Sequence, residues 1–164
     1  MLGSATFSRW KGLHPMPLSI GDTAPNFTVN DTNGKPISLS DYAGKPVVIY
    51  FYPKDDTPGC TKEACSFRDN YQQYLSKGIA VLGVSMDAED SHHAFTEKFN
   101  LPFPLLSDVN GAVTQAYDVQ GEKNGMRYAT RGTYVIGADG KISQVYTSVN
   151  TETHATDILS AIAP

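Results

Sequence analysis

Cysteine is scarce in this chain, whose 164 residues include only Cys60 and Cys65. A small secreted domain held together by disulfides would carry more cysteines, and a chain of this length can bury a core without them. Zinc needs three or four ligands, and none of the four histidines forms a ligand-spaced pair with Cys60. The two cysteines therefore predict a redox site in the cytoplasm, with no metal and no other cofactor.

Long apolar runs and basic clusters are also missing. No stretch approaches the roughly 20 apolar residues that span a bilayer. The net charge of -4 and the pI near 5.4 give no sign of the basic face of a nucleic-acid-binding protein. A hydrophobic content of 40% and a charged content of 18% are typical of a globular domain. We expect neither a membrane nor a nucleic acid as a partner.

The first fifteen residues differ from the rest because they contain Arg9, Lys11 and His14 but no acidic residue. They also lack the long apolar segment of a secretory signal. We interpret residues 1–15 as an N-terminal extension, a tag or a targeting remnant, and residues 16–164 as one domain. A targeting remnant would place the protein in an organelle or the periplasm instead of the cytoplasm.

Two strands with buried faces dominate the pattern of the domain. Residues 47–52 and 79–85 are continuous apolar runs, as in the central strands of a parallel sheet. The helical pattern of residues 60–75 between them indicates a right-handed crossover. A later hairpin of residues 133–136 and 142–146 adds antiparallel strands. The order predicts a three-layer α/β sandwich with a mixed central sheet flanked by helices, like the thioredoxin fold.

Shorter elements are predicted around this framework. An Asn-Gly turn at residues 33–34 indicates a hairpin, and Ser91 is expected to cap a helix that runs to Phe99. The polar stretch 118–130 is interpreted as a loop. The other predicted elements are a helical turn at 40–44, a strand or loop at 105–106, a helix from Asn110 to Tyr117 and a closing helix over 153–162.

Cys60 lies where a helix is predicted to begin, after Pro53 ends a strand and Pro58-Gly59 turns the chain. Unpaired backbone N–H groups and the helix dipole at such a position favour the thiolate, which is the reactive form. Thr57 lies three residues earlier and can direct its hydroxyl toward the same space. Taken alone, a threonine at this position is more often a turn or cap residue.

Cys65 follows Cys60 by five positions, which corresponds to about 500° of helical rotation and a rise of about 7.5 Å. A disulfide needs Cα atoms within about 7 Å and converging Cβ vectors. The two thiols therefore cannot bond in an intact helix, and a catalytic disulfide requires the first turns to unwind. The alternative is that Cys65 is a small apolar side chain of the core.

The run Pro53-x-x-x-Thr57-x-x-Cys60 resembles the signature of the peroxiredoxins, and residues 56–65 are similar to the bacterioferritin comigratory protein or PrxQ subfamily. The resemblance extends from about Ile20 to the C-terminal helix. It implies a thiol peroxidase that acts on hydrogen peroxide and organic hydroperoxides, and a monomer. Cys60 would form a sulfenic acid, and Cys65 would resolve it as an intramolecular disulfide. A thioredoxin-type or glutaredoxin-type reductant would restore both thiols.

The resemblance also implies an arginine beside the reactive sulfur. Arg131 precedes the strand at 133–136, as the family pattern requires, and Arg127 is the rival candidate. Glu63 matches the family motif Thr-x-Glu and either orients Arg131 or complements the helix dipole. Gly132 departs from the family, which more often has serine, alanine or threonine there. His154, in the closing helix, is expected at the surface.

Two other functions were weighed against peroxide reduction. A thioredoxin-like dithiol exchanger would favour Cys-x-x-Cys, which keeps both sulfurs within reach, and the four residues between Cys60 and Cys65 argue against it. A non-enzymatic binding protein or holdase has no specific support, because no long exposed apolar run is evident.

Overall fold

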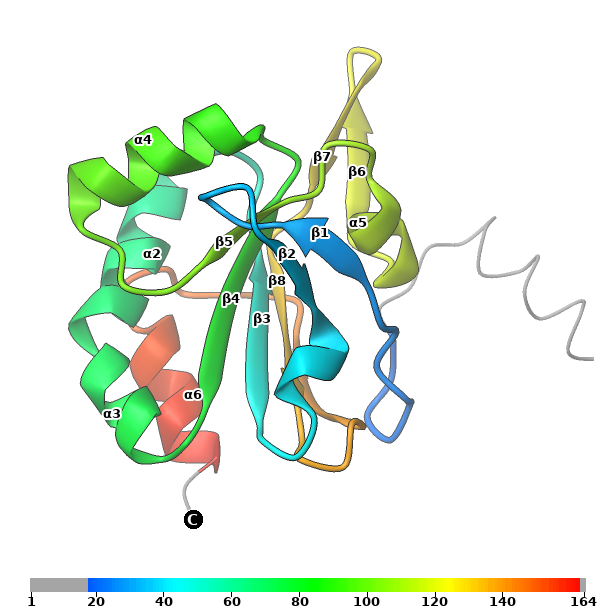
Figure 1. Cartoon of the computed structure of the whole chain (residues 1–164), viewed down its shortest axis with the longest axis vertical. Coiled ribbons are helices and arrows are strands. Elements are labelled where there is room, and N and C mark those ends of the chain that lie inside the picture. The colour runs from blue at the N-terminus through cyan, green and yellow to red at the C-terminus, as the bar shows by residue number, and fades with distance from the viewer. Residues whose placement is uncertain (1–17, 163–164) are drawn as a thin grey trace, which may run out of the picture.

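A five-stranded sheet forms the centre of the computed structural model, which describes residues 18–162 (Figure 1). The first three strands in sheet order pair in parallel, and the last two are antiparallel. This mixed sheet confirms the predicted fold class, whereas the predicted extension of residues 1–15 lies outside the described residues. In sheet order the strands are β5 (Leu105–Ser107), β4 (Ala80–Ser85), β3 (Val47–Phe51), β8 (Gly132–Ile136) and β9 (Ile142–Tyr146).

Both faces of the sheet are covered, which gives the three layers (Figure 1). On one face, Val48 and Tyr50 of β3 pack among side chains of four helices. On the other, Ile49 and Phe51 pack against shorter elements. The first face carries α2 (Pro58–Asp69), α3 (Tyr71–Ser76), α4 (Glu89–Phe99) and α6 (His154–Ile162). The second carries β1 (Thr28–Asn30), β2 (Pro36–Ser38), the 3-10 helix η1 (Leu39–Tyr42) and α5 (Ala112–Ala116).

An aromatic contact fixes α2 on the sheet. The ring of Phe67 stacks on that of Tyr50, with centroids 4.6 Å apart, and both side chains are fully buried. Phe67 also contacts Tyr74 of α3 at 5.7 Å. Aromatic pairs of this kind add to the free energy of burial. The C-terminal half of α2 is therefore held firmly, while its first turn lies at the sheet edge where β3 ends.

The interpretation of residues 118–130 as a loop was wrong. They contain an antiparallel hairpin of β6 (Gln120–Lys123) and β7 (Met126–Ala129), which projects from the body of the molecule (Figure 1). Asn124 and Gly125 join the strands with φ values of 54° and 79°. These are the left-handed conformations of a two-residue type I′ turn. The sequence carries the same Asn-Gly signal that correctly predicted the hairpin of β1 and β2.

The predicted helix over residues 60–75 begins earlier and is divided in two. α2 begins at Pro58, and Asn70 separates it from α3. The Asn70 backbone is non-helical, with φ -108° and ψ 7°, and its side-chain amide donates to the carbonyl of Ser66 at 2.8 Å. Asparagine side chains compete with the backbone for such carbonyls, which interrupts the helix.

Two predicted helix starts were displaced. α4 begins at Glu89 rather than at Ser91, whose hydroxyl donates instead to the Asp55 carboxylate at 2.8 Å. α5 has Gly111 as its N-terminal flanking residue, one position after Asn110. Among residues 18–162, no helix combines the length and apolar character needed to cross a membrane.

Candidate active site

The loop between β3 and α2 delivers Cys60 to the edge of the sheet. Pro53 follows the end of β3, and Thr57 has the extended backbone (φ -99°, ψ 157°) of a residue that precedes a helix. Pro58 occupies the first helical position, where a missing N–H costs no hydrogen bond. Cys60 is consequently the third residue of α2, inside the turn whose N–H groups have no helical partner.

The Cys60 sulfur is buried and lies against a cation. The side chain is 1% exposed, and Nη2 of Arg131 donates a hydrogen bond to its Sγ at 3.3 Å. A guanidinium carries a permanent positive charge, so the sulfur lies in a positive electrostatic environment. The helix dipole acts in the same direction.

Arg131 is the residue immediately before β8, and its side chain extends to Cys60. An ion pair with an acidic residue holds the guanidinium in place. Its Nη1 donates to Oε1 of Glu63 at 2.6 Å. Gly59 makes room for the guanidinium, because a Cβ at that position would come within 3.1 Å of Nη2. Gly59 and Glu63 of α2 therefore position the guanidinium of Arg131, which points at the sulfur of Cys60.

Glu63 is fully buried, and its expected place in the first helical turn was wrong, because α2 begins at Pro58 and has no acidic residue in its first turn. Burial raises the pKa of Glu63 to about 7, although the Arg131 guanidinium opposes the shift. Its second oxygen, Oε2, has no hydrogen-bond partner among the described residues. The position favours the first of the two interpretations of Glu63, in which it orients Arg131.

Thr57 directly precedes α2, and its hydroxyl contacts the backbone of the loop between β3 and α2. The Oγ1–H donates to the backbone carbonyl of Lys54 at 2.8 Å, and the side chain makes no cap hydrogen bond to α2. Its oxygen therefore keeps its lone pairs for another donor. Thr57 is therefore not a side-chain helix cap, which is a common role for a threonine at this position.

Cys65 lies on the same continuous helix as Cys60, and both thiols are free. Cys65 is partly exposed, and burial raises the pKa of its thiol. The helix is intact between the two residues, so the predicted separation by about 500° of rotation holds in this conformation. A bond between them needs a change in α2.

Arg127 does not approach Cys60. It lies on β7, and its Nη1 is near Gly111 at the start of α5. Between the two candidate arginines, the structure brings only Arg131 to the sulfur. Gly132, the departure from the family pattern, begins β8, where a Cβ would lie 3.3 Å from the carbonyl oxygen of Tyr146.

The expectation that His154 is a surface residue was wrong. It is 1% exposed, its Nε2 lies 2.8 Å from the hydroxyl of Thr133, and its ring packs edge-on against Phe67 and Tyr146. Burial lowers the pKa of His154 to about 4, and Arg131 acts in the same direction. The histidine is therefore neutral near pH 7.

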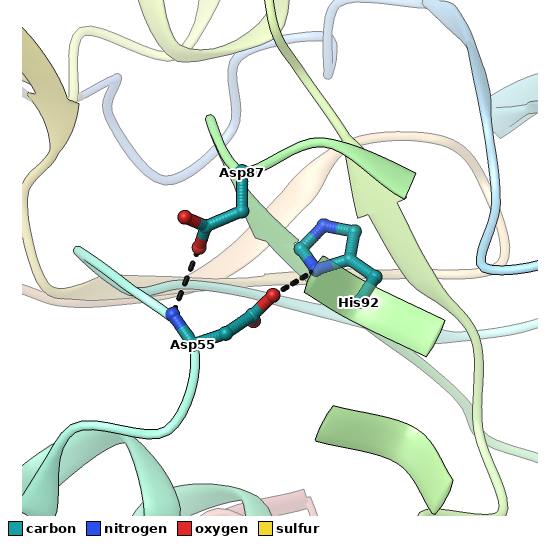
Figure 2. Close-up of side chains that lie close together, drawn as sticks. All are labelled: Asp55, Asp87 and His92. Carbon is teal, nitrogen blue, oxygen red and sulfur yellow. Dashed lines mark hydrogen bonds and ion pairs between the residues drawn. The ribbon is translucent and has the colours of Figure 1, made fainter. Parts of the chain in front are cut away.

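A group of polar residues that the sequence did not single out lies behind the loop of Cys60. Asp55, Asp87 and His92 place ligand-type atoms within 4.8 Å of one another (Figure 2). They come from three separate segments, so no local spacing marks them. The only sequence signal is polarity directly after the two buried strands β3 and β4.

A groove of about 310 Å³ lies beside Arg131, between the start of β8, the end of β9 and the base of the hairpin of β6 and β7. Apolar atoms of Val119, Val145 and Tyr146 line part of it. Arg131 is one of the residues that line the groove.

Comparison with known proteins agrees with this geometry. Residues 20–145 match the AhpC/TSA family. A bcp-type peroxiredoxin of Coxiella burnetii is 44% identical over 151 residues, which cover 90% of this chain and 100% of the relative. A cysteine mutant of PrxQ from Xylella fastidiosa superposes with a TM-score of 0.84 at 33% identity, over 90% and 96% of the two chains. The bacterioferritin comigratory protein of Xanthomonas campestris, studied for its alkyl peroxide reduction activity, gives 0.77 at 36% identity, over 82% and 88%.

Proposed function

Since this chain belongs to the AhpC/TSA family and is a peroxiredoxin of the bacterioferritin comigratory protein or PrxQ type, it reduces peroxides with a thiol, and we propose that Cys60 is that thiol. The observation that carries the proposal is the contact of 3.3 Å between Nη2 of Arg131 and Sγ of Cys60. Cys65 has no comparable cation on its sulfur among the described hydrogen bonds, and burial raises the pKa of its thiol.

In the first step the Cys60 thiolate attacks the terminal oxygen of ROOH. An S–O bond forms, the O–O bond breaks, and the electron pair of that bond leaves on RO⁻, which takes a proton to become ROH. Cys60 is oxidised to the sulfenic acid Cys–SOH. Arg131 stabilises the negative charge as it moves from sulfur to the leaving oxygen.

We propose that the Thr57 hydroxyl contacts the peroxide from the side opposite Arg131. Because it donates to the Lys54 carbonyl, its oxygen is free to accept the hydrogen of ROOH. Pro53 and Gly59 support the site through the backbone: Pro53 ends the strand, and Gly59 leaves space for Arg131. This arrangement aligns the O–O bond with the sulfur between Thr57 and the N-terminus of α2.

In the second step the Cys65 thiol attacks the sulfenic sulfur. An S–S bond forms between Cys60 and Cys65, and the hydroxyl leaves as water. A thioredoxin-type or glutaredoxin-type dithiol then exchanges with the disulfide, becomes oxidised itself and returns both cysteines to thiols. We assign the cycle to the monomer and to a reducing compartment such as the cytoplasm, where such dithiols are maintained.

We assign both hydrogen peroxide and organic hydroperoxides as substrates. The partly apolar groove beside Arg131 has room for an organic substituent, and the Xanthomonas campestris relative is associated with alkyl peroxide reduction. A bulky hydroperoxide should therefore react at a rate similar to that of hydrogen peroxide.

The test measures consumption of hydrogen peroxide with thioredoxin for the wild type, Cys60→Ser and Cys65→Ser. We expect Cys60→Ser to lose turnover and Cys65→Ser to react once without forming an intramolecular disulfide. Turnover by Cys60→Ser would contradict the assignment of the reactive thiol. Oxidised wild type without a Cys60–Cys65 bond in its mass spectrum would contradict the two-cysteine cycle and leave the first step intact.

A further inference from the structure

The loop that carries Thr57 is tied to the neighbouring helix by a buried pair of residues. Asp55 lies in the loop between β3 and α2, and His92 lies in α4 (Figure 2). Nδ1 of His92 is 2.7 Å from Oδ2 of Asp55, and the side chains are 0% and 3% exposed. Neither residue contacts Cys60 or Arg131 among the described hydrogen bonds, so the peroxide-reducing group does not explain the pair.

Buried hydrogen bonds hold both members of the pair. Nε2 of His92 lies 2.9 Å from the carbonyl oxygen of Leu106, which can only accept, so Nε2 is the donor. The Asp55 carboxyl group accepts from the hydroxyls of Tyr52 (2.7 Å) and Ser91 (2.8 Å). With the bond to Nδ1 of His92, Asp55 therefore makes three side-chain hydrogen bonds.

Both ring nitrogens of His92 are engaged in hydrogen bonds, although Asp55, Asp87 and His92 are close together. Asp87 instead binds the loop backbone. Its Oδ2 accepts the N–H of Asp55 at 2.8 Å and the hydroxyl of Ser85 at 2.7 Å. The loop is thus anchored at both the side chain and the backbone of residue 55.

A third interaction fixes the next residue, Asp56. Asp56 has a left-handed backbone with φ 58°, which is uncommon for a residue with a side chain. Its carboxylate pairs with the ammonium of Lys98 on α4 at 2.8 Å. Residues 55 and 56 are consequently fixed to α4 and to the end of β4, directly before Thr57 and the first turn of α2.

Resting on the proposed function of Cys60, we propose that the hydrogen-bonded pair of Asp55 and His92 is a positioning device that holds the turn from Thr57 to Cys60 in its peroxide-reducing conformation. Attack on peroxide needs this turn folded, because Thr57, Arg131 and the α2 terminus must converge on the sulfur. Formation of the Cys60–Cys65 disulfide needs the turn unwound. The Asp55–His92 pair therefore accelerates the first step and slows the second.

The opposite effects on the two steps provide the test. Asp55→Asn and His92→Asn each replace one member of the pair, and His92→Asn keeps one N–H donor for Asp55. His93→Asn is the matched control, because His93 is the next residue of α4 and its side chain is 54% exposed. Sulfenic acid formation is measured in a Cys65→Ser background by quenched trapping with dimedone. Disulfide formation is measured by mass spectrometry with both cysteines present.

We expect Asp55→Asn and His92→Asn to form the sulfenic acid about tenfold more slowly, since misplacement of reacting groups has effects of this size or larger. The disulfide step should be unchanged or faster, and less Cys60 should reach the sulfinic acid at high peroxide. His93→Asn should match the wild type in both steps. Equal slowing of both steps, or no change in either, would overturn the proposal.

Backbone amide hydrogen exchange separates this proposal from the proposed function, because it needs no peroxide. The amides of residues 55–66 should exchange faster in Asp55→Asn than in His93→Asn, and unchanged exchange would refute the positioning role even if the enzyme is active. If Asp55→Asn does not fold, Ser91→Ala removes a single donor to Asp55 and should show the same effects in weaker form. A wild type without peroxide turnover would instead refute the proposed function.

Discussion

Arg131 is the residue on which the other groups of the site converge. One of its nitrogens binds the Cys60 sulfur at 3.3 Å, and another binds Glu63 at 2.6 Å. Gly59 leaves the guanidinium enough space to lie against α2. Since these three partners are within six positions on one helix, the local shape of α2 determines where the positive charge lies.

Replacing Gly59 with alanine should separate activity from stability. The added Cβ would come within 3.1 Å of Nη2 and displace the guanidinium. We expect peroxide reduction to slow by about 10- to 100-fold, since a shift of about 1 Å can have such an effect. Alanine is the better helix former by up to about 1 kcal/mol, so the free energy of unfolding should stay within about 1 kcal/mol of the wild type.

Peroxide kinetics and urea unfolding of Gly59→Ala check this expectation. Gly78→Ala is the comparison for a glycine substitution far from the site, where a Cβ meets no atom within 4 Å. That variant should be active, although its left-handed φ of 70° makes alanine strained there. Full activity in Gly59→Ala would show that Arg131 does not need the space.

Glu63 should make stability fall as the pH rises toward neutrality. Burial raises its pKa to about 7 from an ordinary value of 4.5, so the folded protein holds this proton more tightly than the unfolded chain. The contribution is fully present below pH 4.5 and is lost as the pH rises through about 7. The shift corresponds to about 3 kcal/mol. Urea unfolding across this range should show the fall in wild type relative to Glu63→Gln, and parallel curves would contradict it.

At the scale of secondary structure, α6 and β8 form a support behind the site. His154 of α6 lies 2.8 Å from Thr133 of β8, two positions after Arg131. The same ring packs on Phe67 of α2. His154 therefore links β8, the strand that follows Arg131, with α2, the helix that contains Cys60.

The contribution of His154 to the stability of the fold should decrease at acidic pH. Burial lowers the pKa of His154 to about 4 from 6.5, so the unfolded chain takes up the proton first. Its contribution is present above pH 6.5 and is lost as the pH falls through about 4, a change of about 3 kcal/mol. His154→Gln should remove this part of the acid sensitivity in unfolding experiments. His93→Gln, on the exposed face of α4, should leave it unchanged.

The elements that the sequence predicted well are those with strong local signals. The continuous apolar run of residues 47–52 indicated the central strand, and the Pro58-Gly59-Cys60 run indicated the helix start. Asn124-Gly125 carried an equally clear turn signal, but the polar strands around it obscured the hairpin of β6 and β7. These strands project from the body, so they lack the alternation that a half-buried strand requires.

Other features depend on contacts between distant segments, which no local pattern encodes. In the sequence, His154 is a polar residue of a short predicted helix. It is buried because α6 packs on α2 and β8. Likewise, Asp55 and His92 are 37 residues apart and meet because β3 ends and α4 begins at the same edge of the sheet. The sequence identified Cys60, Thr57 and Arg131 through the family resemblance, whereas the groups that hold them in place required the structure.

For the whole molecule, the catalytic cycle is a competition between two shapes of α2. The reduced shape buries Cys60 at 1% exposure, seats Glu63 beside Arg131 and packs the helix on α6. The disulfide-bonded shape must give up the first turns of α2, because five helical positions separate the sulfurs by too large a rotation. Oxidation therefore exchanges tertiary contacts for one covalent bond.

We expect the oxidised protein to melt at a lower temperature than the reduced protein, unlike most proteins that gain a disulfide. A closed loop of about six residues restrains the unfolded chain by only about 2 kcal/mol. Unwinding loses the Arg131–Cys60 contact, helical hydrogen bonds worth about 1 kcal/mol each and the burial of Cys60 and Ala64. Thermal unfolding and far-ultraviolet circular dichroism of both redox states measure the change, with Cys65→Ser exposed to a single equivalent of peroxide as the control that oxidises without cross-linking. A higher melting temperature with undiminished helicity in the cross-linked wild type would mean that α2 accommodates the disulfide without opening.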